Sequence, residues 1–219
     1  MRLTVWHAAW MTKSAWEDLA ETIAIAPYPV QALPADAQRA QGCLAALGIT
    51  TRSWLGAVVA NTGGLLIDHG WLRVLGSGAR ELPDVLSYAD PAMGGLVVAL
   101  DVLGGQFAWV TTKPGKRPTI HYFGPDLLEW QDLEQGYADW LYHVLRGSLT
   151  AFYETLRWPD WEAEVAGTGL DQGIYAYPPP WSVQGKDLST STRKPVPMGE
   201  LVAFHHDTAK WINSGTEGK

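Results

Sequence analysis

The residues best placed to do chemistry stand in a row, Asp68-His69-Gly70-Trp71. An aspartate beside a histidine is a combination that general bases and metal sites both use. Either use needs further groups that converge in space, and neighbouring residues of a strand point to opposite faces. The same residues also fit a tight turn between two strands, with Asp68 bonding backbone amides and Gly70 at positive φ. We therefore expect these residues to form a structural turn rather than a catalytic or metal site.

A small-ligand pocket or an enzyme around this turn is the alternative hypothesis. It would combine Arg52 and Arg73, as cations that bind carboxylates or other anions, with Asp68, His69 and Trp71. Convergence of Arg and His on a cleft, with a shifted histidine titration, would favour it. No residue is assigned a catalytic role, and we expect a protein that is not an enzyme, although this alternative stays open.

No metal and no cofactor are expected. His205, His206 and Asp207 are adjacent in a predicted helix, but adjacent helical residues face different ways. The i, i+4 histidine pair of a helical zinc site is absent. The single cysteine, Cys43, excludes a cysteine-based zinc site and an intrachain disulfide. The paired glycines at 63–64 and 104–105 lack the spacing of phosphate-binding loops.

Binding of another protein is the favoured function. The 16 basic and 23 acidic residues give a net charge of −7, which argues against a nucleic-acid binder. Between residues 124 and 171, ten acidic residues stand with only Arg146 and Arg157, an imbalance that suits a basic partner. The tentative contact residues are Trp130, Asp132, Glu134 and Asp139. A well-solvated helical surface is the plainer explanation of the same charges.

The composition leaves a third hypothesis, self-association into a homo-oligomer. The chain has 12 tryptophans, and Trp is enriched at the energetic centres of interfaces.

The sequence has no pattern of a secretory signal, and its apolar runs are too short to span a bilayer. We therefore expect a cytoplasmic protein without a membrane partner.

These residues must be positioned by helices at both ends of the chain and strands in its middle, an α+β pattern. We expect one domain with N-terminal helices in 1–50 and a mostly antiparallel sheet in 51–123. A helical block in 124–166 would follow. An irregular strap and a last helix would occupy 167–219.

Capping and turn residues place the first elements. Ser14 and Glu17 have the spacing of a capping box. Pro34 is predicted to begin a second helix, and Gly48 to end it. The apolar run 54–60 is predicted as a strand, followed by a turn at Gly63-Gly64.

Later elements follow from periodicity. Strands are predicted at 65–67, 71–75, 95–101, 106–111 and 119–123, with a hairpin turn at Gly104-Gly105 between the third and fourth. Helices are predicted around 137–145, 149–156, 160–165 and 200–212. The last of these would direct Leu201, Phe204, Thr208 and Trp211 inward.

Several strings of the chain carry a family resemblance. The distinctive ones run from Thr50 to Gly56, Thr62 to Arg73, Asp101 to Ala108, Tyr122 to Asp126, Phe152 to Pro159 and Arg193 to Pro197. Together they resemble a bacterial family catalogued as domain of unknown function 2625, over nearly the whole chain. The layout also resembles, more distantly, the SUKH superfamily, which includes toxin-immunity proteins. That resemblance implies a SUKH-like fold and binding of a protein partner such as a basic toxin domain, and it carries over no catalytic residue.

Overall fold

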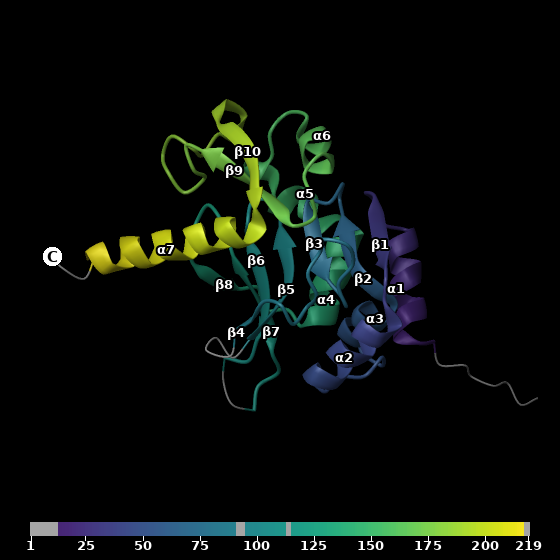
Figure 1. Cartoon of the computed structure of the whole chain (residues 1–219). Coiled ribbons are helices and arrows are strands. Elements are labelled where there is room, and N and C mark those ends of the chain that lie inside the picture. The colour runs from purple at the N-terminus through teal and green to yellow at the C-terminus, as the bar shows by residue number, and fades with distance from the viewer. Residues whose placement is uncertain (1–12, 91–94, 113–114, 217–219) are drawn as a thin grey trace, which may run out of the picture.

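An antiparallel sheet forms the centre of the molecule. The structure, a computed structural model, describes residues 13–90, 95–112 and 115–216. The strand order is β1-β2-β3-β5-β6-β7-β8, with β4 paired to β5 outside this order. A separate hairpin of β9 and β10 and helices from both ends of the chain surround the sheet (Figure 1). The predicted α+β class is confirmed.

The first helix begins at the predicted capping box. In α1 (Ala15–Ala24) the Ser14 hydroxyl accepts a hydrogen bond from the Glu17 amide at 3.2 Å. The Glu17 carboxylate accepts one from the Ser14 amide at 2.8 Å. Both bonds satisfy amides that a helix start would otherwise leave without partners.

The second helix begins later than predicted. Pro34 is the last residue of the edge strand β1 (Val30–Pro34), so its assignment to a helix start was wrong. An edge strand tolerates a residue that has no N–H to donate. Asp36 caps α2 (Ala37–Leu47) instead, and its carboxylate accepts from the Arg39 amide at 2.9 Å. The predicted end at Gly48 is confirmed, with a left-handed φ of 63°.

The predicted strand at 54–60 was wrong, because these residues form helix α3 (Trp54–Asn61). Ser53 caps this helix and accepts from the Gly56 amide at 3.1 Å. Most of the helix is buried, and a short apolar run has the same pattern in a buried helix as in a buried strand. The predicted turn at Gly63-Gly64 was also wrong, since both glycines lie within β2 (Thr62–Ile67).

The other strands of the sheet follow in chain order: β3 (Leu72–Leu75), β4 (Ala89–Asp90), β5 (Gly95–Asp101), β6 (Gln106–Val110), β7 (Thr119–Phe123) and β8 (Trp130–Asp132). The hairpin between β5 and β6 is confirmed, with Gly104 at φ 84°. Edge strand β8 lies in the segment predicted to be wholly helical, so that prediction needs correction. Pairing to β7 satisfies those of its backbone groups that face β7.

Short helices follow the sheet. They are α4 (Tyr137–His143), a π-helical turn (Val144–Ser148), α5 (Leu149–Phe152), a 3₁₀ turn (Glu154–Leu156) and α6 (Trp161–Ala166). The strap predicted at 167–197 is not irregular throughout. It contains an antiparallel hairpin of β9 (Gln172–Tyr177) and β10 (Thr192–Pro197), with a 3₁₀ turn (Leu188–Thr190) between them. Pairing within the hairpin gives the backbone partners that a long connection needs.

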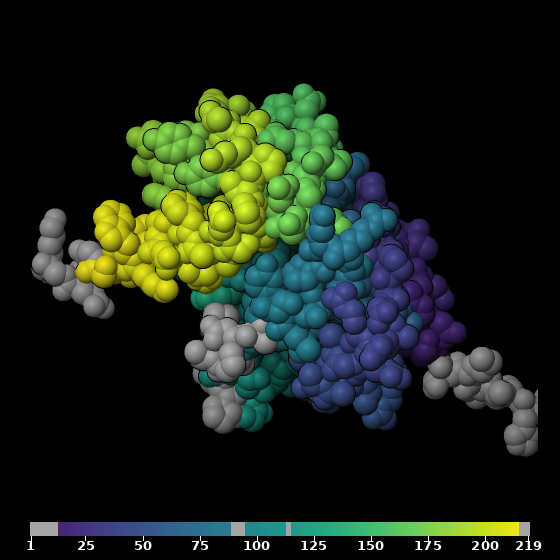
Figure 2. Space-filling model, in the orientation of Figure 1, coloured from purple at the N-terminus to yellow at the C-terminus, as the bar shows by residue number. Residues whose placement is uncertain are grey.

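The last helix, α7 (Met198–Thr216), starts two positions before the predicted Glu200. The buried face of this helix differs from the predicted one by a rotation about the helix axis. Leu201 is buried as expected, but Phe204 is 38% exposed and Trp211 75% exposed. The buried face consists of Met198, Leu201, Val202, His205 and Ala209. The far end of α7 projects from the body of the molecule (Figures 1 and 2). No helix in the described ranges is long and apolar enough to cross a membrane.

A carboxylate lies at the centre of the core. Asp101, at the end of β5, is fully buried. It accepts hydrogen bonds from the amides of Leu103 at 2.9 Å and Gly105 at 2.8 Å. The hydroxyls of Tyr122 at 2.8 Å and Tyr153 at 3.1 Å also donate to it. Burial raises the pKa of Asp101, and these four donors act in the opposite direction.

Candidate functional site

The turn between β2 and β3 carries the candidate site. Asp68, His69 and Gly70 all have positive φ values, 55°, 60° and 87°. The Trp71 amide donates to the Asp68 carbonyl at 3.0 Å and closes the turn. The predicted tight turn with Gly70 at positive φ is confirmed. The predicted role of the Asp68 side chain was wrong, because among the described residues its carboxylate accepts from Arg157 and from no backbone amide.

Arg157 holds this turn from a distant part of the chain. Its guanidinium pairs with the buried Asp68 carboxylate. The guanidinium carbon also lies 4.2 Å from the ring centre of Trp161 and 5.2 Å from that of Trp71. Trp71 is fully buried and contacts Trp161 edge-on, with the ring centroids 5.0 Å apart. The ion pair and the cation–π contacts together give the turn a rigid base.

Arg73, two residues after the turn, is the unusual cation of the site. Only 1% of its surface is exposed. Its Nε donates to the carbonyl of Gly70 at 3.4 Å, and its Nη1 donates to the carbonyls of Leu170, at 3.0 Å, and Gln172. No described residue accepts a hydrogen bond from Nη2, and no described carboxylate forms an ion pair with Arg73. A buried cation that contacts carbonyls and no carboxylate is costly, because the carbonyl dipoles replace its hydration only in part.

Burial lowers the pKa of Arg73 to about 10, so the guanidinium remains charged at neutral pH. The charges of Asp101 and Asp171 act against this shift, and neither is in ion-pair contact.

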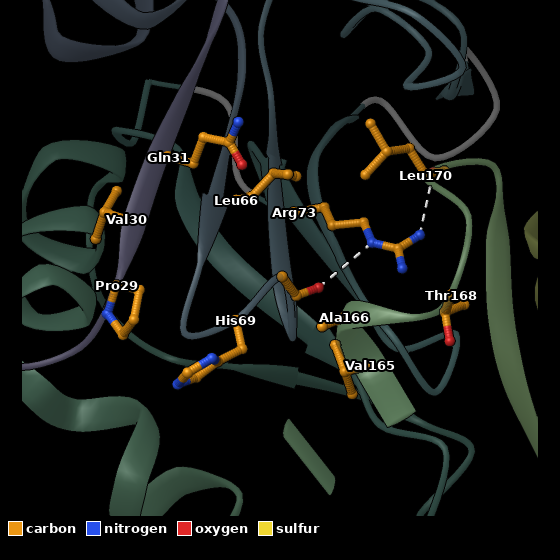
Figure 3. Close-up of a pocket in the computed structure, with 11 residues that line it drawn as sticks. Pro29, Val30, Gln31, Leu66, His69, Arg73, Val165, Ala166, Thr168 and Leu170 are labelled. Atoms are coloured by element: carbon orange, nitrogen blue, oxygen red, sulfur yellow. Dashed lines mark hydrogen bonds between the residues drawn. The ribbon is translucent and has the colours of Figure 1, made fainter. Parts of the chain in front are cut away.

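A cavity of about 280 Å³ opens beside this guanidinium (Figure 3). Figure 3 shows Arg73 directed toward the segment that carries Ala166, Thr168 and Leu170. His69 is exposed on the cavity wall, and its ring meets Trp161 edge-on with the centroids 5.8 Å apart. The remaining walls come from β1 and the residue before it, from β2 and from the end of α6, namely Pro29, Val30, Gln31, Leu66 and Val165.

The structure brings together most of the residues predicted for this pocket. His69 and Arg73 line the cavity, while Asp68 and Trp71 are buried and are not among its lining residues. Arg52 is not among the lining residues. It is exposed just before α3, where its Nε lies 3.5 Å from the Thr50 hydroxyl.

Sequence reasoning missed the wall contributed by Gln31 and Thr168, and the ion pair of Arg157. No local pattern signals these contacts, since the residues lie far from the turn along the chain.

The four residues of the predicted protein-binding surface differ in burial and in their contacts. Trp130 is half-buried on β8, and its ring centroid lies 5.3 Å from that of Phe123. Asp132 accepts from the Glu134 amide at 2.8 Å, the main cause of its lowered pKa, and lies 3.7 Å from His121. Glu134 and Asp139 are exposed and form no ion pair with a described residue. The surface is therefore built on an edge strand and the start of α4 rather than on a helix alone.

The adjacent histidines of α7 point into different environments. His205 is buried, and burial lowers its pKa to about 4. His206 stacks on Phe123 with the centroids 4.4 Å apart and hydrogen-bonds Gln106. In the part of the chain that the structure describes, no group of three or more His, Cys, Asp or Glu side chains could hold a metal ion.

Comparison with known proteins gives the chain a family. The family model described as "Protein of unknown function DUF2625" matches residues 9–201. The chain is 37% identical to the uncharacterized protein YbfG of Escherichia coli (strain K12) over 194 residues, covering 86% of this chain and 88% of that protein. It is 36% identical over 169 residues to an uncharacterized protein of Haemophilus influenzae (strain ATCC 51907 / DSM 11121 / KW20 / Rd), covering 73% of this chain and 72% of that one. No solved structure matches it. The chain belongs to the DUF2625 family.

Proposed function

We propose that the protein binds a small aliphatic carboxylate in the cavity between Arg73 and His69. The observation that carries this proposal is the buried guanidinium of Arg73, which has no ion-paired carboxylate and no acceptor for Nη2 among the described residues. A ligand carboxylate would supply both the missing acceptor and the missing negative charge. Charge-assisted hydrogen bonds of this kind are stronger than neutral ones.

The cavity walls favour an acid with a short apolar body. Val30, Leu66 and Val165 offer apolar surface, and the volume of about 280 Å³ suits a small molecule. Arg73 also lines a separate cavity of about 190 Å³ that includes Glu81 and Asp171. The carboxylates there would repel an anion, so the cavity beside His69 is the favoured one. His69 is exposed at this cavity, and its ring makes no hydrogen bond to a described residue.

Calorimetric titration with straight-chain acids from acetate to hexanoate, each paired with its alcohol, tests the proposal. At least one acid should bind while its alcohol does not. Arg73→Met should weaken binding by about tenfold to a hundredfold, the loss expected for hydrogen bonds to a charged group. His69→Ala, at an exposed position, should weaken it less without disturbing the fold. Arg52→Gln is the matched control and should bind as the wild type does.

Two results would overturn this function. One is equal binding of acids and alcohols, and the other is unchanged acid affinity in both Arg73→Met and His69→Ala. Because Arg73 is buried, its variant is compared only after circular dichroism and unfolding midpoints show a folded protein. If Arg73→Met does not fold, His69→Ala and the pairs of acid and alcohol still decide the question.

A protein partner at the β8 edge is the second candidate function. The observation that favours it is the exposure of Glu134 and Asp139, which have no ion-pair partner among the described residues and lie near Asp132 in the sequence. Such carboxylates could meet a basic toxin domain in the cytoplasm, as the SUKH resemblance implies, with Trp130 as an anchor.

Capture from a lysate at low and high salt, followed by mass spectrometry, tests this surface. The triple variant Asp132→Lys, Glu134→Lys and Asp139→Lys should lose a stoichiometric basic partner that the wild type retains at low salt. A matched triple reversal at Glu21, Glu162 and Asp207, which are exposed and cap no helix, is the control. Equal capture by both variants would contradict the acidic-surface hypothesis.

A further inference from the structure

A second and larger cavity lies where the chain bends between α4 and α5. The helix passes through a π-helical turn, Val144–Ser148, in which Gly147 has a φ of 108°. Most residues avoid that conformation, and π-helical turns occur often at functional sites. The bend leaves a cavity of about 680 Å³, which reaches from the bend to β6 and the segment after β8. None of the residues proposed to bind the aliphatic acid lines it.

Aromatic rings form the inner wall of this second cavity. Phe107 and Trp140 are buried, and their centroids lie 5.1 Å apart. Phe152 continues the wall, with its centroid 5.8 Å from that of Phe107, and it is 38% exposed. An exposed ring beside two buried ones is a surface on which a flat ligand can stack.

The rim of the cavity carries a cation, Arg146. His143 lines the same rim, and both side chains are exposed. The His143 ring bonds the Gln135 side chain through Nδ1 at 3.2 Å. Arg157, the other base of the acidic segment 124–171, is paired with Asp68, but Arg146 has no ion-pair partner among the described residues. The one unpaired base of a strongly acidic segment therefore lies at the aromatic cavity.

We propose that this cavity binds a planar aromatic anion, whose ring packs on the exposed ring of Phe152, beside the buried Phe107 and Trp140, and whose acidic group meets Arg146 and His143. The rings provide stacking surface, and the rim provides complementary charge. The volume of about 680 Å³ accommodates a ligand of two or three rings. This site takes an aromatic ligand, whereas the cavity beside Arg73 takes a small aliphatic one.

Two matched dyes test the proposal by fluorescence titration of the folded protein. The first is 8-anilinonaphthalene-1-sulfonate, an aromatic anion, and the second is N-phenyl-1-naphthylamine, which lacks the sulfonate. The wild type should bind the anion at one saturable site and more tightly than the neutral dye. Arg146→Gln should raise the Kd of the anion by about twofold to fivefold, with little effect on the neutral dye. Phe152→Ala should weaken both.

Matched controls separate this site from the Arg73 cavity. His69→Ala and Arg52→Gln should bind both dyes as the wild type does. Unchanged anion affinity in Arg146→Gln would overturn the proposal, as would equal wild-type affinities for the two dyes or the absence of saturable binding. Arg146 is exposed, so its variant should keep the wild-type unfolding midpoint. The test therefore does not depend on Phe152→Ala being folded.

Discussion

Arg157 and Asp68 form an ion pair between residues 89 positions apart in the chain. The pair joins the turn that carries His69 to the segment that leads into α6. Side-chain exposure is 14% for Arg157 and 7% for Asp68, so water screens the interaction only weakly. The same contact fixes two walls of the Arg73 cavity relative to each other, because His69 comes from the turn and Val165 from α6.

Removing one partner of this pair should destabilise the protein. We expect Asp68→Asn to lower the free energy of unfolding by about 3 kcal/mol, because the guanidinium of Arg157 loses its counter-charge while still largely buried. Asp68→Asn combined with Arg157→Met should lose less than the sum of the single variants. Urea unfolding at pH 7 measures all three proteins. Additive losses would show that the pair is not coupled in this way.

Replacing Asp101 by asparagine should also destabilise the fold. The carboxylate accepts from four donors, whereas an amide keeps one acceptor oxygen and turns N–H groups toward the other donors. We expect a loss of about 2 kcal/mol or more in the urea unfolding free energy. Tyr122→Phe, which removes a single donor, should cost less. An Asp101→Asn protein as stable as the wild type would contradict this account.

Stability should fall in mild acid because of His205. Burial lowers its pKa to about 4 in the folded protein, against an ordinary value of 6.5. Between these two values the unfolded chain binds more protons, so the free energy of unfolding decreases as the pH falls from 6.5 toward 4. The full effect is on the order of 3 kcal/mol. Unfolding titrations of the wild type and His205→Leu across this range should show a steeper loss in the wild type. Parallel curves would contradict the prediction.

Two helical glycines should respond oppositely to alanine. A Cβ at Gly42 in α2 would meet nothing within 4 Å, so Gly42→Ala should stabilise the protein by about 0.5–1 kcal/mol. A Cβ at Gly56 in α3 would lie 2.0 Å from the Thr50 carbonyl oxygen, so Gly56→Ala should destabilise it by more than about 2 kcal/mol. Thermal unfolding of both variants checks the contrast. Shifts of the same sign would mean that α3 does not approach Thr50 so closely.

Local patterns were sufficient wherever a few neighbouring residues decide the backbone. The capping box of Ser14 and Glu17, the end of α2 at Gly48 and the turn at Gly70 depend on hydrogen bonds or φ values within a few positions. Local patterns gave the wrong element where a helix and a strand have similar apolar patterns and burial decides between them. The run 54–60 became a helix because Ser53 caps it and because it is buried among other helices and the sheet.

By itself, the sequence determined the α+β class, the hairpin at Gly104 and the family, because these depend on short-range periodicity, turn residues and recognisable strings. Only the tertiary structure decided which cations have partners. Arg52, Arg73 and Arg157 are the same residue type, but one is exposed, one is buried without a carboxylate and one pairs with Asp68. Burial and charge pairing depend on contacts between segments far apart in the chain, and no local pattern encodes them.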